Sequence, residues 1–491
     1  FKNQAIMKQL LTFFLLLSAT SIWAQQVQFS KPQQFNANKD KVVIGGWVGQ
    51  HLMVYYTNKN ESLLDLYDAG MNRKAIVTLN FMPDNPTQVK LLPRKNEALM
   101  FYGAQLSSKE LYYIARLNAE GKIIGRPKAI DTASQNFFGN TKLSYHLIHS
   151  GDHSKVAVFS YRIKDSKLEY GYSLANDSLE VLHSSNNSVP TKSFYEISQV
   201  ILKDDGRLLV LLTDLATSKN NEVAEAMLYI IEPTDKRKAE VKAFTFDFGD
   251  AFTSNLILQE DIMNTDLIHF AGLSQNKPGY TNGVYAGTID LKAANNSIIQ
   301  GSNSLLPADM DLGPAAAQAQ NRNYIIKDIA VKNDGGMIIT AEAFTKIYTY
   351  VPAGGYGRYS MGYGGMHTQR SIEYYYGNIL LLETDPNHQI SSSYVIPKWQ
   401  RSVDDAGLHS SFSMLNSGIA LNFVFNENNG RAQRVVGATL PANGTLQTQT
   451  IATQTKAEGK WIPKMGKQVA ATEMIIPLLS SNKLQLAKIS F

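Results

Sequence analysis

One apolar strand pattern recurs along the whole chain, and this repeat constrains the fold more than any other feature. Each copy follows a turn rich in Asp, Asn, Gly or Lys and contains mainly β-branched, aromatic and other apolar residues over the length of one strand. A period of this length is typical of repeat folds, in which neighbouring units bury one another's faces. The copies begin 47 to 82 residues apart, at His51, Ala98, Lys155, Arg207, Asp266, Gly336, Gly418 and Glu473.

A second strand follows each copy after a polar gap, and weaker strands usually precede and follow the pair. Turns such as Asp205-Gly206 and Asn443-Gly444 supply residues that tolerate positive φ. The second strands begin at Ser62, Glu110, Lys167, Ala226, Gly283, Asn378, Ala432 and Lys483. We therefore predict an all-β fold, a β-propeller of about eight four-stranded blades. A count of seven blades, a pair of β-sandwiches and a chain of hairpins are the alternatives.

The two ends of the chain are expected to complete one blade together. The last unit stops at Phe491 after its third strand, and residues 25–35 can supply the missing outer strand. Such closure hides the edges of the first and last sheets. No Pro-, Gly- or Ser-rich linker separates the units, and residues 313–323 are interpreted as a connection between blades. We predict a single propeller domain over residues 25–491.

The beginning of the chain has the order of a secretory signal peptide. Lys8 supplies the positive charge, residues 10–17 form an apolar run too short to span a bilayer, and Ala24-Gln25 is a plausible cleavage point. We predict that residues 1–24 are upstream sequence and signal peptide, and that the mature chain is periplasmic or secreted without a transmembrane segment. A buried N-terminal helix is the alternative.

Charge and cysteine content exclude several classes of function. The formal net charge is +5, and removal of Lys2 and Lys8 with the leader leaves +3, which does not indicate a nucleic-acid partner. The chain has no cysteine, so disulfides, thiolate catalysis and thiolate zinc sites are excluded. The fold must therefore be stabilised by its apolar core.

The sixth unit is the longest and contains a segment rich in tyrosine and glycine, residues 344–378. We predict a long hairpin with a pliable tip that projects from one face, because tyrosine suits both protein and glycan contacts. The alternative is a loop that packs on its own propeller. The predicted binding residues are Tyr348, Tyr350, Tyr356, Arg358, Tyr359, Tyr363, His367, Arg370, Tyr374, Tyr375 and Tyr376.

Other candidate chemical groups are interpreted as turn residues. Their spacing matches no zinc, calcium or hydrolase motif, so we predict no catalytic residues, no metal and no cofactor. Residues from several blades can meet at the axis of a propeller, which keeps an enzyme as an alternative. The groups are the histidines His146, His149 and His153 and the carboxylate pairs Asp309 with Asp311 and Asp404 with Asp405.

Part of the chain resembles a group of known proteins. The stretches IIKDIAVKNDGGMIITAEAF from Ile325, YYYGNILLLETDPNHQISSSYVIPKWQ from Tyr374 and VDDAGLHSSFSML from Val403 resemble secreted or periplasmic propeller-like proteins of Gram-negative bacteria, which are mostly uncharacterised. The resemblance covers about residues 324–421 and implies export and a repeat fold. It transfers no catalytic residues.

These observations favour an exported binding or scaffolding protein with a protein partner, for example an accessory subunit of an outer-membrane assembly. A glycan-binding propeller that uses exposed tyrosines and Trp47, Trp399 or Trp461 is the second hypothesis. A hydrolase or lyase with a metal or carboxylate site at the axis is the third.

Overall fold

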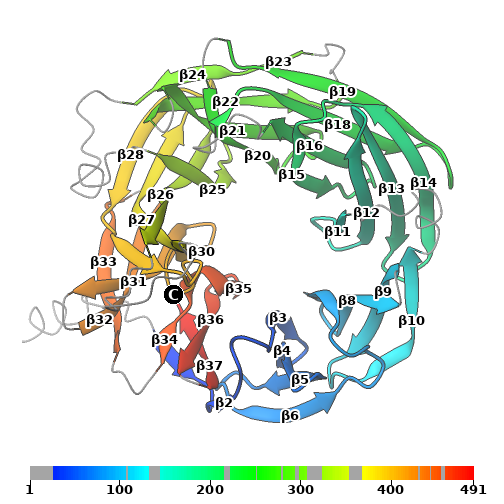
Figure 1. Cartoon of the computed structure of the whole chain (residues 1–491), viewed down its shortest axis with the longest axis vertical. Coiled ribbons are helices and arrows are strands. Elements are labelled where there is room, and N and C mark those ends of the chain that lie inside the picture. Colours follow the sequence, from blue (N-terminus) through cyan, green and yellow to red (C-terminus); the bar gives the residue numbers. More distant parts are fainter. Residues whose placement is uncertain are drawn as a thin grey trace, which may run out of the picture.

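The computed structural model describes residues 26–106, 109–131, 144–214, 222–249, 252–277, 280–292, 298–306, 323–352, 368–429, 432–442, 444–454, 459–480 and 482–491. The strands form eight sheets around one axis (Figure 1). This arrangement confirms the predicted all-β propeller of eight blades. The predicted signal peptide lies outside the described residues. None of the described segments forms a helix long and apolar enough to span a membrane.

The first four blades follow the chain from the axis outwards. Blade 1 contains β3 (Val42–Val48), β4 (His51–Asn58), β5 (Glu61–Tyr67) and β6 (Arg73–Thr78). Blade 2 contains β7 (Thr87–Pro93), β8 (Glu97–Leu106), β9 (Lys109–Asn118) and β10 (Ile123–Asp131). Blade 3 contains β11 (Ser144–His149), β12 (Lys155–Lys164), β13 (Lys167–Asn176) and β14 (Val181–Pro190). Blade 4 contains β15 (Tyr195–Leu202), β16 (Leu208–Asp214), β18 (Ala226–Pro233) and β19 (Ala239–Asp247).

Of the last four blades, blades 6 and 8 contain strands beyond the four of this plan. Blade 5 contains β20 (Phe252–Glu260), β21 (Leu267–Lys277), β22 (Tyr280–Asp290) and β24 (Ser302–Leu305). Blade 6 contains β25 (Tyr324–Val331), β26 (Met337–Pro352), β27 (Thr368–Thr384), β28 (Ile390–Ile396) and, beside β27, β29 (Gln400–Val403). Blade 7 contains β30 (Phe412–Asn416), β31 (Ala420–Asn429), β32 (Ala432–Pro441) and β33 (Gln447–Gln454). Blade 8 contains β34 (Lys460–Trp461), a 3-10 turn at Pro463–Met465, β35 (Lys467–Ala470), β36 (Glu473–Ser480), β37 (Lys483–Ser490), β1 (Gln26–Phe29) and β2 (Gln33–Gln34).

The core is divided among the eight interfaces between neighbouring blades, and each interface has its own apolar cluster. Tyr55 of blade 1 lies in one cluster with Met100 of blade 2, and Val54 lies in another with Ile475 of blade 8. Both faces of a middle strand are therefore covered, which explains why all seven residues of β16 are buried. The near-continuous apolar runs in the sequence reflect this double burial.

The N-terminal segment closes the ring, as predicted. β1 pairs antiparallel with β37, with Gln26 opposite Ser490 and Phe29 opposite Ala487, and β2 continues the pairing. Phe29 also meets the ring of Trp461 edge to face, with 6.0 Å between the centroids. Blade 8 is thus built from both ends of the described chain.

Two short strands connect blades 4 and 5 in a way that the repeat pattern did not predict. β17 (Glu222–Val223) leaves blade 4 and pairs with β20 of blade 5. β23 (Ile298–Gln300) leaves blade 5 and pairs parallel with β19 of blade 4. These two strands therefore join blades 4 and 5 by backbone hydrogen bonds.

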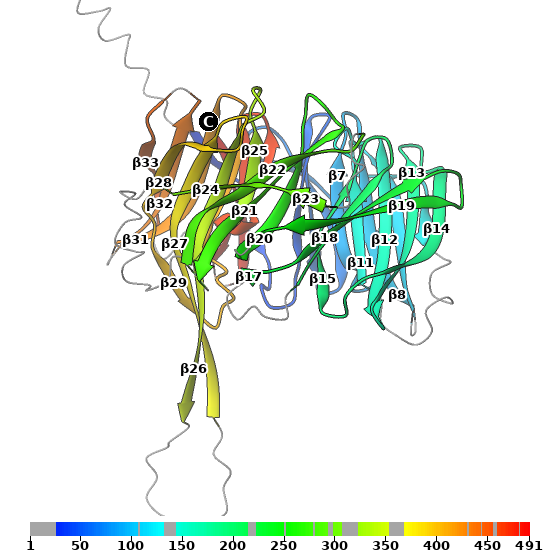
Figure 2. The ribbon, with the colours of Figure 1, turned by 90° about the horizontal axis from the view of Figure 1, so that it is seen from above.

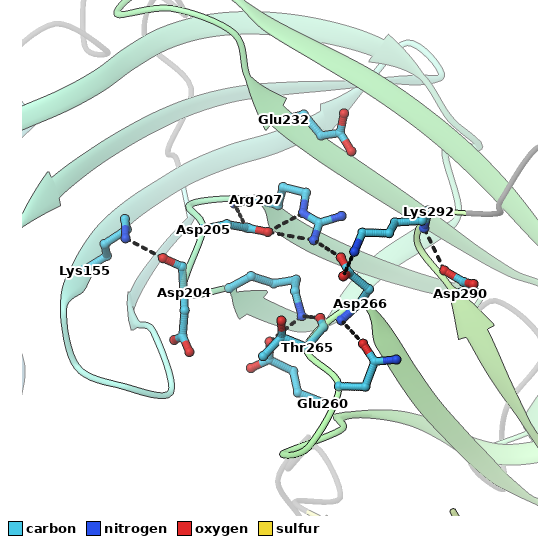
Figure 3. Close-up of polar contacts among 12 residues, drawn as sticks. Lys155, Asp204, Asp205, Arg207, Glu232, Glu260, Thr265, Asp266, Asp290 and Lys292 are labelled. Carbon is cyan, nitrogen blue, oxygen red and sulfur yellow. Dashed lines mark hydrogen bonds and ion pairs between the residues drawn. The ribbon is translucent and has the colours of Figure 1, made fainter.

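Charged side chains connect blades 3, 4 and 5 at the turns between strands (Figure 3). Lys155 of blade 3 donates to the carbonyl oxygen of Asp204 in the next turn. Arg207 of that turn binds Asp266 of blade 5 at 2.8 Å, and Lys292 binds the other oxygen of the same carboxylate at 2.6 Å. Because each contact crosses or borders an interface, the blades are held by polar bonds as well as by their cores.

Candidate functional site

The predicted hairpin of blade 6 projects from one face of the ring (Figure 2). Pairing between β25 and β26 ends where Tyr324 lies opposite Ala343. β26 and β27 continue as a ribbon from Phe344 opposite Tyr376 to Pro352 opposite Thr368, and β29 pairs with β27 at the base of this ribbon, from Gln400 opposite Tyr376 to Val403 opposite Glu373. We call residues 344–352 and 368–376 the stem.

The structure describes some of the predicted binding residues and not others. Tyr350 and Arg370 are opposite each other in the backbone register of the stem, and their side chains lie outside the described part. Tyr348, Tyr374, Tyr375 and Tyr376 are described with their side chains, and the register distributes them over both faces of the stem. The tip residues that lie outside the described residues are Tyr356, Arg358, Tyr359, Tyr363 and His367.

One face of the stem is organised around a lysine. The ammonium nitrogen of Lys346 lies 5.0 Å from the ring centroid of Tyr348 and 5.6 Å from that of Tyr374. Such cation–π contacts contribute about 0.5–1 kcal/mol at exposed sites. They limit the conformations of two of the predicted binding residues.

The opposite face of the stem presents an apolar platform. Ile347, Glu373 and Val403 lie in one cross-strand row, and Tyr375 lies beside Arg401 in the next row on the same face. Trp399 extends the platform, with its ring centroid 6.3 Å from that of Tyr375. Large apolar side chains here remain accessible, with Ile347 45 %, Trp399 46 % and Val403 47 % exposed. We call Ile347, Tyr375, Trp399 and Val403, together with the Glu373–Arg401 pair, the stem platform.

Glu373 and Arg401 of the stem platform hold Tyr375 in place. Arg401 donates to both oxygens of Glu373, at 2.8 and 3.2 Å, and its guanidinium carbon lies 5.9 Å from the ring centroid of Tyr375. The hydroxyl of Tyr375 donates to Glu373. The hydrogen bonds from Arg401 and then from Tyr375 hold the pKa of Glu373 below its usual range. The platform is therefore ordered and carries balanced charge.

Tyr376 differs from Tyr348, Tyr374 and Tyr375, because it is buried where the stem meets the ring. It packs on Phe344, with 4.9 Å between the centroids, and lies against Gly407. Gly407 has a φ of +64°, and a Cβ atom there would lie 2.6 Å from the tyrosine ring. Burial, reinforced by the charge of Glu342, raises the pKa of Tyr376 to about 12. Tyr376 thus anchors the stem.

A fully buried ion pair lies beneath the stem. Lys398 Nζ is 2.7 Å from Glu342 Oε1, and both side chains have no exposed surface. The second oxygen of Glu342 accepts a hydrogen bond from Ser411 at 2.7 Å and lies 3.4 Å from Lys327. Burial lowers the pKa of Lys398, although Glu342 acts in the opposite direction. Since Glu342 belongs to β26 and Lys398 precedes β29, the pair fixes β29 against the stem.

The platform includes residues that the sequence did not identify as binding residues. Ile347 and Glu373 lie within the predicted hairpin but were not among its binding residues. Arg401 and Val403 lie outside that hairpin, and Trp399 was considered only for glycan binding. The residues Gln400–Val403 show no apolar–polar alternation, so the sequence did not indicate that β29 pairs with β27. The other two tryptophans considered for glycan binding are less accessible: Trp47 is half-buried and donates to Glu473 at 2.9 Å, and Trp461 is buried.

The histidine and aspartate candidates that the structure describes are not arranged as a metal site. His149 and His153 approach each other with 4.8 Å between the ring centroids, while His146 stacks on Tyr161. Asp404 accepts a hydrogen bond from the backbone NH group of Ile372 on β27, and Asp405 accepts one from that of Gly407. Asp309 and Asp311 lie outside the described residues. Over the described ranges, no group of three or more His, Asp or Glu side chains is arranged to hold a metal ion.

A buried relay between blades 5 and 6 has the contacts of a hydrolytic triad. His269 binds Asp261 at 2.9 Å and Thr288 at 3.1 Å, and Thr288 Oγ1 also lies 3.2 Å from His388 Nε2. The hydroxyl group of Thr288, which a triad would use as its nucleophile, thus contacts two imidazole rings. Burial acts to raise the pKa of Asp261, but hydrogen bonds from His269 and two backbone NH groups outweigh it and lower that pKa. We interpret the relay as a structural link between blades.

Comparisons with known proteins find similar solved structures at low sequence identity. The chain is similar to the WD40 domain of SCAP from fission yeast, with 11 % identity, a TM-score of 0.42, and coverage of 95 % of this chain and 98 % of that one. It is also similar to the Nup133 β-propeller domain of Vanderwaltozyma polyspora, with 11 % identity, a TM-score of 0.38, and coverage of 81 % and 100 %.

A third similar structure is prolyl oligopeptidase B from Galerina marginata, with 8 % identity, a TM-score of 0.41, and coverage of 93 % of this chain and 56 % of that one. No family model matches the chain, and no curated protein matches it. The eight sheets and the closure of the ring establish the architecture. The chain is an eight-bladed β-propeller.

Proposed function

We propose that this chain is an exported propeller that binds a protein partner through the stem platform. The observation that carries the proposal is the exposure of Ile347, Trp399 and Val403 on an ordered ribbon outside the ring. Aromatic side chains beside a paired arginine are typical of the residues that dominate protein interfaces. Loops and ribbons on a rigid frame commonly carry the binding function of a fold.

The frame supports this role because it restricts the platform before any partner arrives. Tyr375 is held by Glu373 and Arg401, and β29 is fixed by the buried pair of Glu342 and Lys398. A partner that binds a preorganised surface loses less conformational entropy on association. The location that we propose is the periplasm or the cell exterior, with an accessory role in an outer-membrane assembly.

Quantitative co-purification from the native host tests the proposal. We expect the variant with Trp399→Ala and Tyr375→Ala to lose at least 90 % of a partner that the unchanged chain retains, since interface aromatics often contribute about 2 kcal/mol or more. The matched control is Phe194→Ala, which removes a similarly exposed aromatic residue between β14 and β15. Equal partner recovery from both variants would contradict the proposal.

Glycan binding is the second candidate, because Trp399 and Tyr375 present neighbouring exposed rings. Aromatic platforms of this kind also suit sugar rings. A glycan array with the unchanged chain and the Trp399→Ala variant separates the two candidates. Binding that is above background and depends on Trp399 would favour the glycan, whereas signals at background would exclude it.

A further inference from the structure

The innermost strands of blades 4, 5 and 6 line a hollow that the stem platform does not use. β15, β20 and β25 follow one another around the axis of the ring (Figure 1). The hollow has a volume of about 330 Å³, which is large enough for a small organic molecule. It is lined by Ser198 and Gln199 of β15, by residues 255–259 of β20 and by residues 327–329 of β25.

The three strands depart from regular pairing at this hollow. Register shifts in their ladders with the second strands of the blades fall directly before Gln199, Ile257 and Asp328. Such β-bulges change the direction of side chains and are frequent beside functional sites. The hollow therefore lies where three neighbouring strands redirect their side chains.

Side-chain amides hold the three strands together around the hollow. The amide of Gln199 donates to the carbonyl oxygen of Leu258 and accepts from the NH group of the same residue, each at 2.8 Å. The amide of Asn255 makes the same two contacts with Ile326, at 2.9 and 3.0 Å. Paired hydrogen bonds thus join each inner strand to the next, so the shape of the hollow is set before a ligand enters.

Two other polar side chains leave oxygen atoms as acceptors in the hollow. The hydroxyl of Ser198 donates to the carbonyl oxygen of Leu211 at 3.2 Å, and the amide nitrogen of Gln259 donates to that of Glu260 at 3.3 Å. A hydroxyl oxygen and an amide oxygen can each accept further hydrogen bonds. No donor among the described residues contacts either oxygen, so both are available to a ligand.

Asp328 gives the hollow a carboxylate that no cation balances among the described residues. Burial raises the pKa of Asp328, and a hydrogen bond from the backbone NH group of Ile329 acts in the opposite direction. Part of the residue's surface stays accessible. Lys327 also lines the hollow, but its ammonium nitrogen lies 3.4 Å from a carboxylate oxygen of Glu342. A desolvated carboxylate without a charged partner in a hollow is typical of a binding site.

We propose that the hollow binds a small primary amine, with the ammonium group on Asp328 and with Ser198 and Gln259 as further acceptors. An ammonium group has three donors and no acceptor, which matches a carboxylate beside two neutral oxygen atoms. Its positive charge compensates Asp328 for the water that burial removes. The site is separate from the stem platform, and its ligand is independent of the protein partner proposed above.

Calorimetric titration of the mature chain with n-butylammonium chloride tests the site, at an ionic strength held constant with sodium chloride. Sodium butyrate controls for the sign of the charge, and tetramethylammonium chloride controls for the hydrogen-bond donors. We expect saturable binding of n-butylammonium, with an affinity at least tenfold higher than that of either control ion. Heats no larger than those of the two controls would overturn the proposal.

Matched aspartate variants locate the binding. Asp328→Asn removes the charge at unchanged size and is expected to weaken the affinity at least tenfold, because a charged acceptor is lost. Since burial disfavours the ionised carboxylate, this variant should fold at least as well as the unchanged chain. Asp334→Asn is the control, because it removes an exposed carboxylate from the turn after the same strand. Equal affinities of the two variants would overturn the proposal.

Gln259→Met gives a second test that leaves the carboxylate in place. It removes one acceptor at similar size, and we expect the affinity for n-butylammonium to decrease about fivefold. Gln34→Met is its control, because Gln34 is exposed on β2, and it should leave the affinity unchanged. An affinity that is the same in Gln259→Met and Gln34→Met would contradict the proposed contact, even where Asp328→Asn folds poorly.

Discussion

Single buried charges determine how firmly the stem is attached to the ring. Glu342 and Lys398 have no exposed surface, so neither can be solvated if its partner is lost. The nearby Lys327 compensates only in part, from 3.4 Å. Removal of one member of such a pair is costly because an uncompensated charge stays buried.

The Lys398→Met variant is expected to lose about 3 kcal/mol of unfolding free energy, at the lower end for buried pairs because Lys327 remains. The midpoint of urea unfolding measures the loss. The double variant Glu342→Leu with Lys398→Met should recover most of it, since no charge is left buried. Lys242→Met removes an exposed pair with Glu232 and should cost no more than about 1 kcal/mol. Equal losses in Lys398→Met and Lys242→Met would contradict the assignment.

His388 gives the link between blades 5 and 6 a dependence on pH. Its Nε2 atom contacts Thr288, while its buried Nδ1 atom has no hydrogen-bond partner in the described part of the chain. A second proton on Nδ1 would therefore find no acceptor. Burial, aided by the charge of His269, lowers the pKa of His388 in the folded state.

This depressed pKa predicts that folded stability decreases on acidification. The unfolded chain takes up the proton first as the pH falls below about 6.5, and each further decrease favours the unfolded state until the folded pKa is passed. Buried Asp65 and Asp328 have raised pKa values and act in the opposite direction, so a variant is needed to isolate His388. Between pH 7.5 and pH 5.5, Tm should fall less in His388→Gln than in the unchanged chain. Equal decreases would contradict the prediction.

The short strand β1 is important for the closure of the ring, because its pairing with β37 joins the two ends of the described chain. The interface between blades 8 and 1 depends on this closure. Phe29 also covers Trp461 across the same blade. An open ring would leave an unpaired strand edge, which is a template for aggregation.

An engineered disulfide tests the closure of the ring. The chain has no cysteine of its own, so no other thiol can form a competing disulfide. Gln26→Cys with Ser490→Cys places two thiols at directly opposite positions. We expect oxidation to produce a faster-migrating species on a non-reducing gel, and an increase in stability of about 2–4 kcal/mol. Gln26→Cys with Lys483→Cys is the control, since Lys483 lies seven residues along β37, about 23 Å from the matching position. Equal cross-linking in both pairs would argue against this register.

The sequence predicted those elements whose signal is contained within one strand or one turn. The alternating and apolar runs identified the blades, and the missing fourth strand of the last unit identified the closing role of residues 25–35. Contacts between distant elements carried no such signal. The exchange of β17 and β23 between blades 4 and 5, and the pairing of β29 with β27, depend on tertiary packing. The platform at Trp399 and Val403 was missed for the same reason.

The whole molecule is a closed ring with one ribbon outside it. Eight interface cores and the charged contacts between turns stabilise the ring without any disulfide. The stem shares its strands with blade 6, so its position is set by the ring (Figure 2). Substitution of exposed platform residues should therefore alter binding and leave the stability of the ring within about 0.5 kcal/mol.

Site-specific photocross-linking in the native host is the most direct test of the central claim, that a partner contacts the stem platform. A photoreactive phenylalanine analogue at Val403 lies on the platform, and the same analogue at Phe194 lies on another connection of the ring. We predict a covalent adduct with one partner from position 403, its loss in Trp399→Ala, and no such adduct from position 194. The same adduct from both positions, or a co-purifying partner that never cross-links to position 403, would contradict the claim.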